Sequence, residues 1–257
     1  PYLNDTIVGA LHCPDEGHCN PRLLTHGYAR KAEALGATVK TQTTVTRMER
    51  AGGRWRLALA SSGEGERVVN ADVVVNAAGT WSAHLARMAG VELPVYPIAL
   101  IISVTEKAPV VMQHLVQHVG RKLSLKQVDD GNLLIGGGWL ARLPPEPEQL
   151  RLDYRAALDP GELQKNLATA IGVMPLIGDL HVLRCWTGTT GLTPDQLPII
   201  GASAGAPGFF TAVGGSGFTY GPTYARLLSE LILRQETSFP IAPYSPDRFA
   251  GDRQAQG

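Results

Sequence analysis

Apolar and polar positions change their spacing several times along the chain, which predicts a mixture of helices and strands. Asn20 and Pro21 mark a helix start, because a capping side chain is followed by proline at the first helical position. The apolar residues of that helix fall on roughly one face: Leu23, Leu24, Tyr28, Ala32 and Leu35. Residues 73–75 form a continuous apolar run, typical of a strand buried on both faces. The pattern therefore predicts an α/β fold with mixed α+β character and two kinds of sheet.

The remaining elements follow from the same spacing and from turn residues. Helices are expected at residues 21–35, 81–88, 160–171 and 224–233. Strands are expected at residues 39–48, 55–60, 67–71, 73–75, 98–105, 115–119, 122–128, 132–137, 181–186 and 209–213. Residues 129–132, Asp-Asp-Gly-Asn, predict a tight turn, and residues 143–147 predict a stiff surface loop.

A glycine-rich turn separates the strand at residues 209–213 from the last helix. Gly214, Gly215 and Gly217 stand within four residues, so the backbone can approach a flat or anionic ligand without a Cβ in the way. The following helix directs unpaired N–H groups and its positive dipole end at the turn. The pattern predicts contact with a cofactor; a purely structural strand-to-helix turn is the alternative.

Composition restricts the class of protein. The 257 residues are 44% hydrophobic, and 23 basic residues balance 23 acidic ones. This neutrality argues against nucleic acid or an anionic membrane as the main partner. No apolar run approaches the length of a transmembrane segment. Three cysteines are too few for a disulfide framework, which favours a reducing compartment and a cytoplasmic location.

Two histidine–cysteine pairs near the N-terminus have metal-ligand chemistry. Imidazole and thiolate groups suit zinc, and they occur at His12–Cys13 and His18–Cys19. The spacing is not that of a known tight pair, and residues 14–17 read as a hairpin turn, so no metal is expected. Cys185 beside Trp186 is expected to be a buried structural cysteine.

Several ordered motifs carry a resemblance to a known family. They are residues 72–82 (Asp-Val-Val-Val-Asn-Ala-Ala-Gly-Thr-Trp-Ser), Trp186-Thr187-Gly188, residues 193–201 (Thr-Pro-Asp-Gln-Leu-Pro-Ile-Ile-Gly) and the glycine-rich turn. Together they resemble the D-amino-acid-oxidase-like (DAO) family of FAD-dependent amine and amino-acid oxidoreductases. The spacing from Trp186 to Asp195 is most similar to the branch of sarcosine oxidase β subunits and related proline, opine and glycine-cyanide dehydrogenase subunits.

The resemblance implies a truncated FAD-binding domain of the glutathione-reductase-like type and an antiparallel-sheet substrate domain. Residues 1–96 would be the middle part of the FAD-binding domain with the entry strands of the substrate domain. Residues 97–185 would form the substrate domain, and residues 186–257 the C-terminal part of the FAD-binding domain. Family members open with a strand and a G-x-G-x-x-G turn that holds the FAD pyrophosphate. That motif is absent here, so we expect the C-terminal part of a longer enzyme.

The resemblance also implies contacts with FAD. Residues 77–79 would pass near the cofactor and Val45 near the adenosine, although small residues at 77–79 also suit a strand that turns against a helix. The implied cofactor-binding residues are Val45, Ala77, Ala78, Gly79, Trp81, Gly188, Gly214, Gly215, Ser216, Gly217, Phe218 and Thr219.

The implied reaction is hydride transfer from a C–H bond next to nitrogen to flavin N5, with sarcosine, a D-amino acid, proline or an opine as substrate. The sequence departs from relatives at Thr190, where glycine-oxidase-like proteins have a carboxylate-binding arginine, and at residues 99–101, where many have Arg-Gly-Gln. Arg184, Lys122 and Tyr220 are therefore candidates for that role, and no catalytic residue is assigned.

The quaternary organisation and the type of electron acceptor stay open. The resemblance allows partner subunits of a hetero-oligomeric dehydrogenase, and both oxidase and dehydrogenase activity are compatible with the motifs. The alternative from another class is a non-catalytic chain of the same fold that binds a ligand or a partner.

Overall fold

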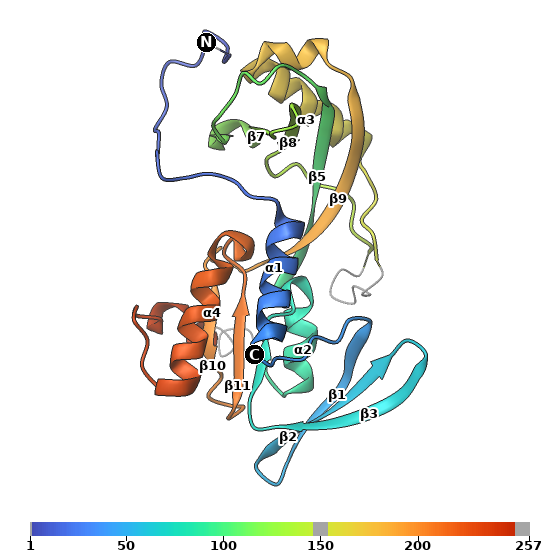
Figure 1. The fold of residues 1–257 in the computed structure, drawn as a ribbon, viewed down its shortest axis with the longest axis vertical. Coiled ribbons are helices and arrows are strands. Elements are labelled where there is room, and N and C mark those ends of the chain that lie inside the picture. The colour runs from blue at the N-terminus through green and yellow to red at the C-terminus, as the bar shows by residue number, and fades with distance from the viewer. Residues whose placement is uncertain (1, 146–153, 250–257) are drawn as a thin grey trace. The chain divides into compact units, whose positions relative to one another are not determined.

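The chain folds into two compact units in a computed structural model that describes residues 2–145 and 154–249. Unit 1 comprises Pro1–Asn20, Ile98–Glu146 and Asp153–Thr189; unit 2 comprises Pro21–Pro97, Pro147–Leu152 and Thr190–Gly257. Figure 1 shows the elements of both units. The mixed α/β class with antiparallel sheets agrees with the prediction. The assignment of residue ranges to a substrate domain and an FAD-binding domain stays a prediction.

Unit 1 is built on a five-stranded sheet with the order β6-β7-β8-β5-β9. Its strands are β5 (Tyr96–Lys107), β6 (Val116–His118), β7 (Leu123–Gln127), β8 (Asn132–Gly136) and β9 (Val182–Leu192). Alternate residues face a core, so that Leu125, Leu133 and Ile135 are fully buried. The predicted turn at residues 129–132 is confirmed, since Gly131 has a φ of +95° and donates its N–H to Val128 O at 2.8 Å.

Helix α3 (Pro160–Val173) packs on this sheet. Its start is that expected from the sequence, because the Asp159 carboxylate accepts the N–H groups of Gly161 and Glu162 at 2.9 and 3.1 Å. The buried Asn166 Nδ2 donates to Gly136 O at 3.1 Å, which ties the helix to strand β8.

Unit 2 contains two three-stranded sheets. The first is the antiparallel meander β1 (Thr43–Ala51), β2 (Arg54–Ser61) and β3 (Glu64–Ala71). The second has the order β10-β11-β4, from β10 (Ile199–Ala202), β11 (Phe209–Val213) and β4 (Val74–Asn76), and β11 runs parallel to β4. The core contains fully buried Phe209 and Ile199, with Trp55 against Phe209.

The helices of unit 2 differ in how many of their residues are buried. They are α1 (Pro21–Ala34), α2 (Ser82–Met88), which follows the 3₁₀ turn η1 (Gly79–Trp81), and α4 (Gly217–Arg234). Helix α1 contains no buried residue; Leu23 is 70% exposed, and Leu35, just past the end of the helix, is 76% exposed. Periodicity therefore located the helix, but it carries no information on what packs against it.

Some element boundaries differ from the prediction. Helix α4 begins at Gly217 rather than at residue 224, so Pro222 and Gly221 lie inside it. Strand β1 begins later than residue 39, and β9 continues to Leu192. Of the predicted loop at residues 143–147, residues 146 and 147 lie outside the described part of the chain.

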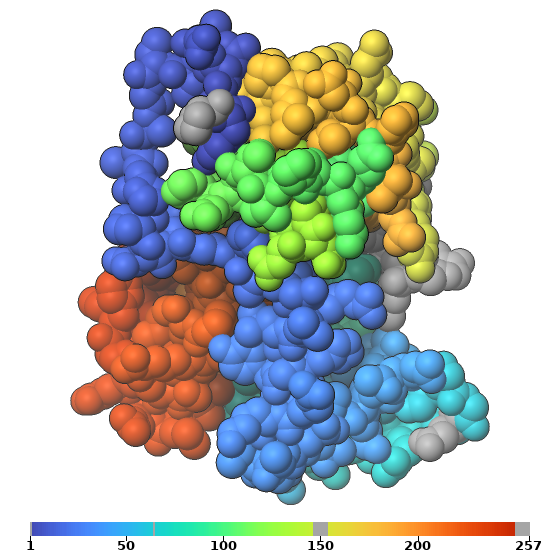
Figure 2. All heavy atoms as spheres, turned by 45° about the horizontal axis from the view of Figure 1, so that its top comes forward, coloured from blue at the N-terminus to red at the C-terminus, as the bar shows by residue number. Residues whose placement is uncertain are grey.

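The N-terminal stretch of unit 1 runs at the surface, where it is blue in Figure 2. Val8 and Leu11 are fully exposed, whereas Asn4 donates its N–H to Val173 O at 2.8 Å. In the two described ranges, no helix is both long and apolar enough to cross a lipid bilayer.

Gly137 and Gly138, which follow β8, offer a matched test of backbone packing. Both have a positive φ, but a Cβ at Gly137 would overlap the Lys122 carbonyl, whereas one at Gly138 has no atom within 4 Å. We expect Gly137→Ala to lower the free energy of unfolding by about 3 kcal/mol, through strain and overlap, and Gly138→Ala by about 1 kcal/mol, through strain alone. Urea denaturation measures both; equal losses would contradict the packing described for this turn.

Candidate functional site

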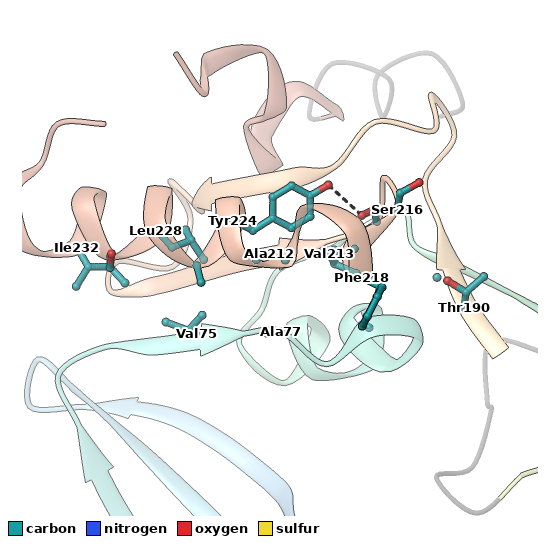
Figure 3. A pocket seen from close by; sticks show the side chains of 17 residues that line it. Val75, Ala77, Thr190, Ala212, Val213, Ser216, Phe218, Tyr224, Leu228 and Ile232 are labelled. Atoms are coloured by element: carbon teal, nitrogen blue, oxygen red, sulfur yellow. Dashed lines mark hydrogen bonds between the residues drawn. The ribbon is translucent and has the colours of Figure 1, made fainter. Parts of the chain in front are cut away.

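A cleft opens along helix α4 in unit 2, with a volume of about 590 Å³. We call it the α4 cleft. All its lining residues are uncharged: Val75, Ala77, Gly79, Thr190, Gly191, Ala212, Val213, Gly214, Ser216, Gly217, Phe218, Gly221, Tyr224, Ala225, Leu228, Ser229 and Ile232. Figure 3 shows Leu228 and Ile232 pointing from α4 toward the side where Val75 lies. The cleft is thus an apolar slot with backbone groups and a few hydroxyls at one end.

The glycine-rich turn forms that end. Gly214, Gly215 and Ser216 have φ values of +80°, +50° and +57°, so three successive residues adopt the left-handed conformation. A Cβ at Gly214 would lie 2.9 Å from the Thr193 methyl group, and one at Gly215 would lie 2.5 Å from Pro198 Cδ. These two glycines therefore allow the turn to pack against residues 193–198.

Other glycines leave the cleft itself open. A Cβ placed on Gly217, Gly221 or Gly79 has no atom within 4 Å among those outside its immediate chain neighbourhood. All three line the α4 cleft, so their missing side chains expose helix and loop backbone to it. Two distinct requirements, tight packing and an open wall, thus account for the cluster of glycines seen in the sequence.

The first turn of α4 is suited to an acceptor or an anion. Its N-cap Ser216 makes no side-chain cap hydrogen bond, and the first N–H groups of a helix have no intrahelical partner. The positive end of the helix dipole lies at the same place. Pro222 has no N–H, so the Phe218 carbonyl also lacks its intrahelical donor. Donors and one acceptor of the backbone are therefore available beside the cleft.

Tyr224 supports the glycine-rich turn from within α4. Its hydroxyl donates to Gly215 O at 2.6 Å. It also lies 3.4 Å from Gly214 O, the contact that the dashed line in Figure 3 marks. Burial raises the pKa of Tyr224 to about 12, so the phenol keeps its proton at neutral pH. The hydroxyl thus satisfies turn carbonyls over the physiological pH range.

The facing wall follows strand β4. Asn76 is fully buried, and its Nδ2 donates to Ser82 O at 2.9 Å while its Oδ1 accepts the Ala78 N–H at 3.3 Å. These bonds span the loop of residues 77–79, in which Gly79 has a φ of +56°. The Asn76 side chain thereby determines how the loop backbone meets the cleft.

The end of β9 completes the wall. Thr80 Oγ1 lies 3.5 Å from Thr190 O, a long hydrogen bond. A Cβ at Gly191 would lie 2.8 Å from Val95 Cγ1 and 3.2 Å from Gly79 O. Gly191 is therefore required for β9 to pass close to the loop after β4.

The structure separates the sequence-predicted cofactor residues into two groups. Those that line the α4 cleft are Ala77, Gly79, Gly214, Ser216, Gly217 and Phe218. Those outside its lining are Val45, Ala78, Trp81, Gly188, Gly215 and Thr219. Val45 packs against the core of unit 2, and Gly188 lies on β9 in unit 1. Whether either group contacts FAD stays a prediction.

Sequence reasoning did not find part of the lining. Gly191 carries no local signal of a site, Thr190 was singled out only as a departure from a carboxylate-binding arginine, and Val75 only as part of the 72–82 motif. The α4 residues could have been found, since Gly217, Gly221, Ala225, Leu228 and Ile232 recur at the three- and four-residue spacing of one helix face.

The three candidates for a substrate-binding role lie outside the cleft lining. Arg184, on β9, and Lys122, which has a φ of +52° before β7, are both exposed residues of unit 1. Tyr220 lines a second cavity of about 490 Å³ in unit 2, and its ring stacks on Tyr224 at 6.2 Å.

The structure shows the surroundings of the histidine and cysteine residues that were singled out in the sequence. Cys13 and Cys19 are free and exposed. The His12 ring meets the His114 ring edge-on at 5.1 Å. Cys185 is half-buried, and its Sγ lies 3.5 Å from Ser103 Oγ.

The chain resembles known proteins over most of its length. The family model for FAD dependent oxidoreductases (DAO) matches residues 1–231. Mitochondrial dimethylglycine dehydrogenase of Rattus norvegicus is 27% identical over 97% of this chain and 30% of its own length. Hydrogen cyanide synthase subunit HcnC of Pseudomonas protegens is 28% identical over 97% of this chain and 57% of its own. L-proline dehydrogenase from P. horikoshii has a similar fold, with a TM-score of 0.78 at 23% identity over 89% of this chain and 59% of that one. The chain thus spans only part of each of these proteins.

Removal of the Tyr224 hydroxyl tests its role at the turn. We expect Tyr224→Phe to lower the free energy of unfolding by about 1–2 kcal/mol, because the part-buried Gly215 carbonyl loses its donor. Tyr220→Phe is the control: its side chain is 52% exposed, and we expect a loss below about 0.5 kcal/mol. Urea denaturation at pH 7 measures both, and equal stabilities of the two variants would contradict the assigned hydrogen bond.

Proposed function

Because the chain belongs to the DAO family of FAD dependent oxidoreductases, we propose that the protein carrying it binds FAD with the flavin ring in the α4 cleft. The proposed reaction is oxidation of a C–N bond in a small amine or amino acid. The observation that carries the proposal is the open backbone wall at Gly79, Gly217 and Gly221, where no side chain obstructs a flat ring.

The electrostatics of the wall support this placement. The N1/C2 carbonyl edge of a flavin becomes negative on reduction, and the uncapped first turn of α4 presents N–H donors to the cleft. A negative charge near a helix N-terminus is stabilised by roughly 0.3–1 kcal/mol at exposed positions, and by more where water is excluded. The α4 terminus would therefore favour the reduced cofactor.

The chemistry divides between cofactor and protein. Bound FAD would supply the hydride acceptor. The backbone at Gly217 and Phe218 would orient the ring, and the apolar lining would exclude water from it. Among the described residues, the α4 cleft lining includes no Asp, Glu, His, Cys, Lys or Arg, and its phenol, Tyr224, keeps its proton at neutral pH; this suits an amine that binds in its neutral form.

The proposed substrate class is drawn from the family and the names of its members. We propose sarcosine, a D-amino acid, proline or an opine, in line with relatives named for dimethylglycine and L-proline. Arg184, Lys122 and Tyr220 are the proposed candidates for the substrate carboxylate. Partner subunits are part of the proposal, because HcnC is named as a subunit.

The cofactor contacts beyond the cleft are proposed from the family resemblance alone. They are Val45 near the adenosine, and Ala78, Trp81, Gly188, Gly215 and Thr219 elsewhere along FAD. The cytoplasmic location likewise stays a prediction from the sequence.

Filling the cleft at Gly217 tests the proposed ring site. Since a Cβ there meets open space, we expect Gly217→Val to keep the fold but to raise the Kd for FAD by about tenfold or more. Flavin fluorescence titration of the protein carrying this chain measures the Kd. Gly205→Val is the matched control, because its Cβ also meets open space but it does not line the cleft. An unchanged Kd in Gly217→Val would contradict the site.

The reaction itself is tested by anaerobic bleaching of the FAD-loaded protein. We expect the visible flavin band to fade on addition of at least one of sarcosine, proline, a D-amino acid or an opine, because the amine transfers a hydride to the ring. Succinate, which has no amine, is the control. A flavin band that none of the amines bleaches would contradict the proposed oxidation of a C–N bond.

A further inference from the structure

A second turn, residues 193–198, lies directly behind the glycine-rich turn. The Thr193 methyl group and Leu197 O would lie 2.9 and 3.5 Å from a Cβ at Gly214, and Pro198 would lie 2.5 Å from one at Gly215. No side chain of the glycine-rich turn separates the two backbones here. A shift of residues 193–198 would therefore be transmitted to Gly214 and Gly215.

The 193–198 turn holds its shape through side-chain bonds to its own backbone. Thr193 Oγ1 donates to Leu197 O at 2.7 Å, and Asp195 Oδ1 accepts the Leu197 N–H at 3.1 Å. Gln196 has a φ of +59°, a left-handed conformation that residues other than glycine rarely adopt. The shape of the turn therefore depends on contacts as well as on local preference.

Arg248 supplies such contacts from more than fifty positions further along the chain. Its Nε lies 2.9 Å from Asp195 Oδ2 and its Nη2 3.1 Å from Oδ1, a two-point ion pair. Nη2 also lies 3.3 Å from Leu197 O. One guanidinium thus holds both the carboxylate and the carbonyl of the 193–198 turn.

The other side of the same guanidinium is fixed as well. Nη1 donates to Tyr244 O at 3.0 Å and to Ser245 O at 3.2 Å, and the group lies over the Phe249 ring at 4.2 Å. The Arg248 side chain is only 15% exposed. A lysine could keep the charge, but not this set of directed bonds.

The 3₁₀ turn that carries Arg248 is itself held in place by neighbouring residues. The turn spans Pro246–Phe249, and the Asp247 carboxylate accepts the Ala204 N–H at 3.1 Å. Pro246 is buried and would lie 3.4 Å from a Cβ at Gly201 on strand β10. Arg248 therefore connects a segment anchored on the sheet to the turn behind Gly214 and Gly215.

We propose that Arg248 is a positioning residue for the α4 cleft, because it holds the 193–198 turn against Gly214 and Gly215. It acts through Asp195 and Leu197 and does not line the cleft itself. Its relevance to the flavin rests on the proposed function, but its effect on the two turns does not.

Hydrogen–deuterium exchange without FAD tests the effect on the turns. We expect Arg248→Met to accelerate exchange by about tenfold or more in peptides covering residues 193–198 and 214–217, while strands β1–β3 keep their rates. The control Arg54→Met removes the Arg54–Asp72 ion pair of 2.7 Å elsewhere in unit 2 and is expected to leave both turns unchanged. No acceleration in Arg248→Met, or a uniform one across unit 2, would overturn the proposal.

Arg248→Lys separates positioning from general destabilisation and serves where the Met variant does not fold. We expect it to accelerate exchange in the same two turns by a smaller factor, because the ion pair survives and the carbonyl bonds do not. An exchange map identical to that of the unsubstituted protein would overturn the proposal.

The FAD-loaded protein gives the second readout. We expect Arg248→Met to raise the Kd for FAD by about tenfold and to shift the visible flavin band, with Arg248→Lys intermediate. A Kd and a band unchanged in Arg248→Met would overturn the link to the cleft. If the unsubstituted protein binds no FAD, the proposed function fails, and the exchange experiment still decides the role of Arg248.

Discussion

The close packing of two turns, residues 193–198 and 214–217, is the constraint on which the rest of the site depends. Gly214 and Gly215 have no side chain because Thr193 and Pro198 occupy the space, and the left-handed backbone of this turn directs the chain into helix α4. The position of the α4 N-terminus, and with it the donors at the end of the cleft, follows from that contact. Tyr224 and Arg248 reinforce it from either side.

The site is built from backbone rather than from charged side chains. The lining of the α4 cleft is uncharged, so the helix terminus and the first-turn N–H groups of α4 supply its main electrostatic feature. This arrangement suits a cofactor that carries the reactive group and needs orientation, exclusion of water and stabilisation of one negative edge. It also explains why no catalytic side chain emerged from the sequence.

Much of the secondary structure, and the family, could be predicted from the sequence, because the signals for them were local. Asp159 and Pro160 marked the start of α3, the Asp-Asp-Gly-Asn segment marked the turn between β7 and β8, and the ordered motifs identified the family. The separate roles of Gly214 and Gly217 could not be predicted, since one faces Thr193 and the other open space. The link from Arg248 to Asp195 spans a sequence separation of 53 residues, which no local pattern encodes. The exposed apolar face of α1 shows the same limit, because periodicity does not identify what packs on it.

A crystal structure of the protein with FAD bound tests the central claim most directly. The account predicts that the N1/C2 edge of the flavin ring lies about 3 Å from a first-turn N–H of α4, with the ring against Gly79 and Gly217. A flavin ring bound elsewhere, with the α4 cleft free of it, would contradict the account.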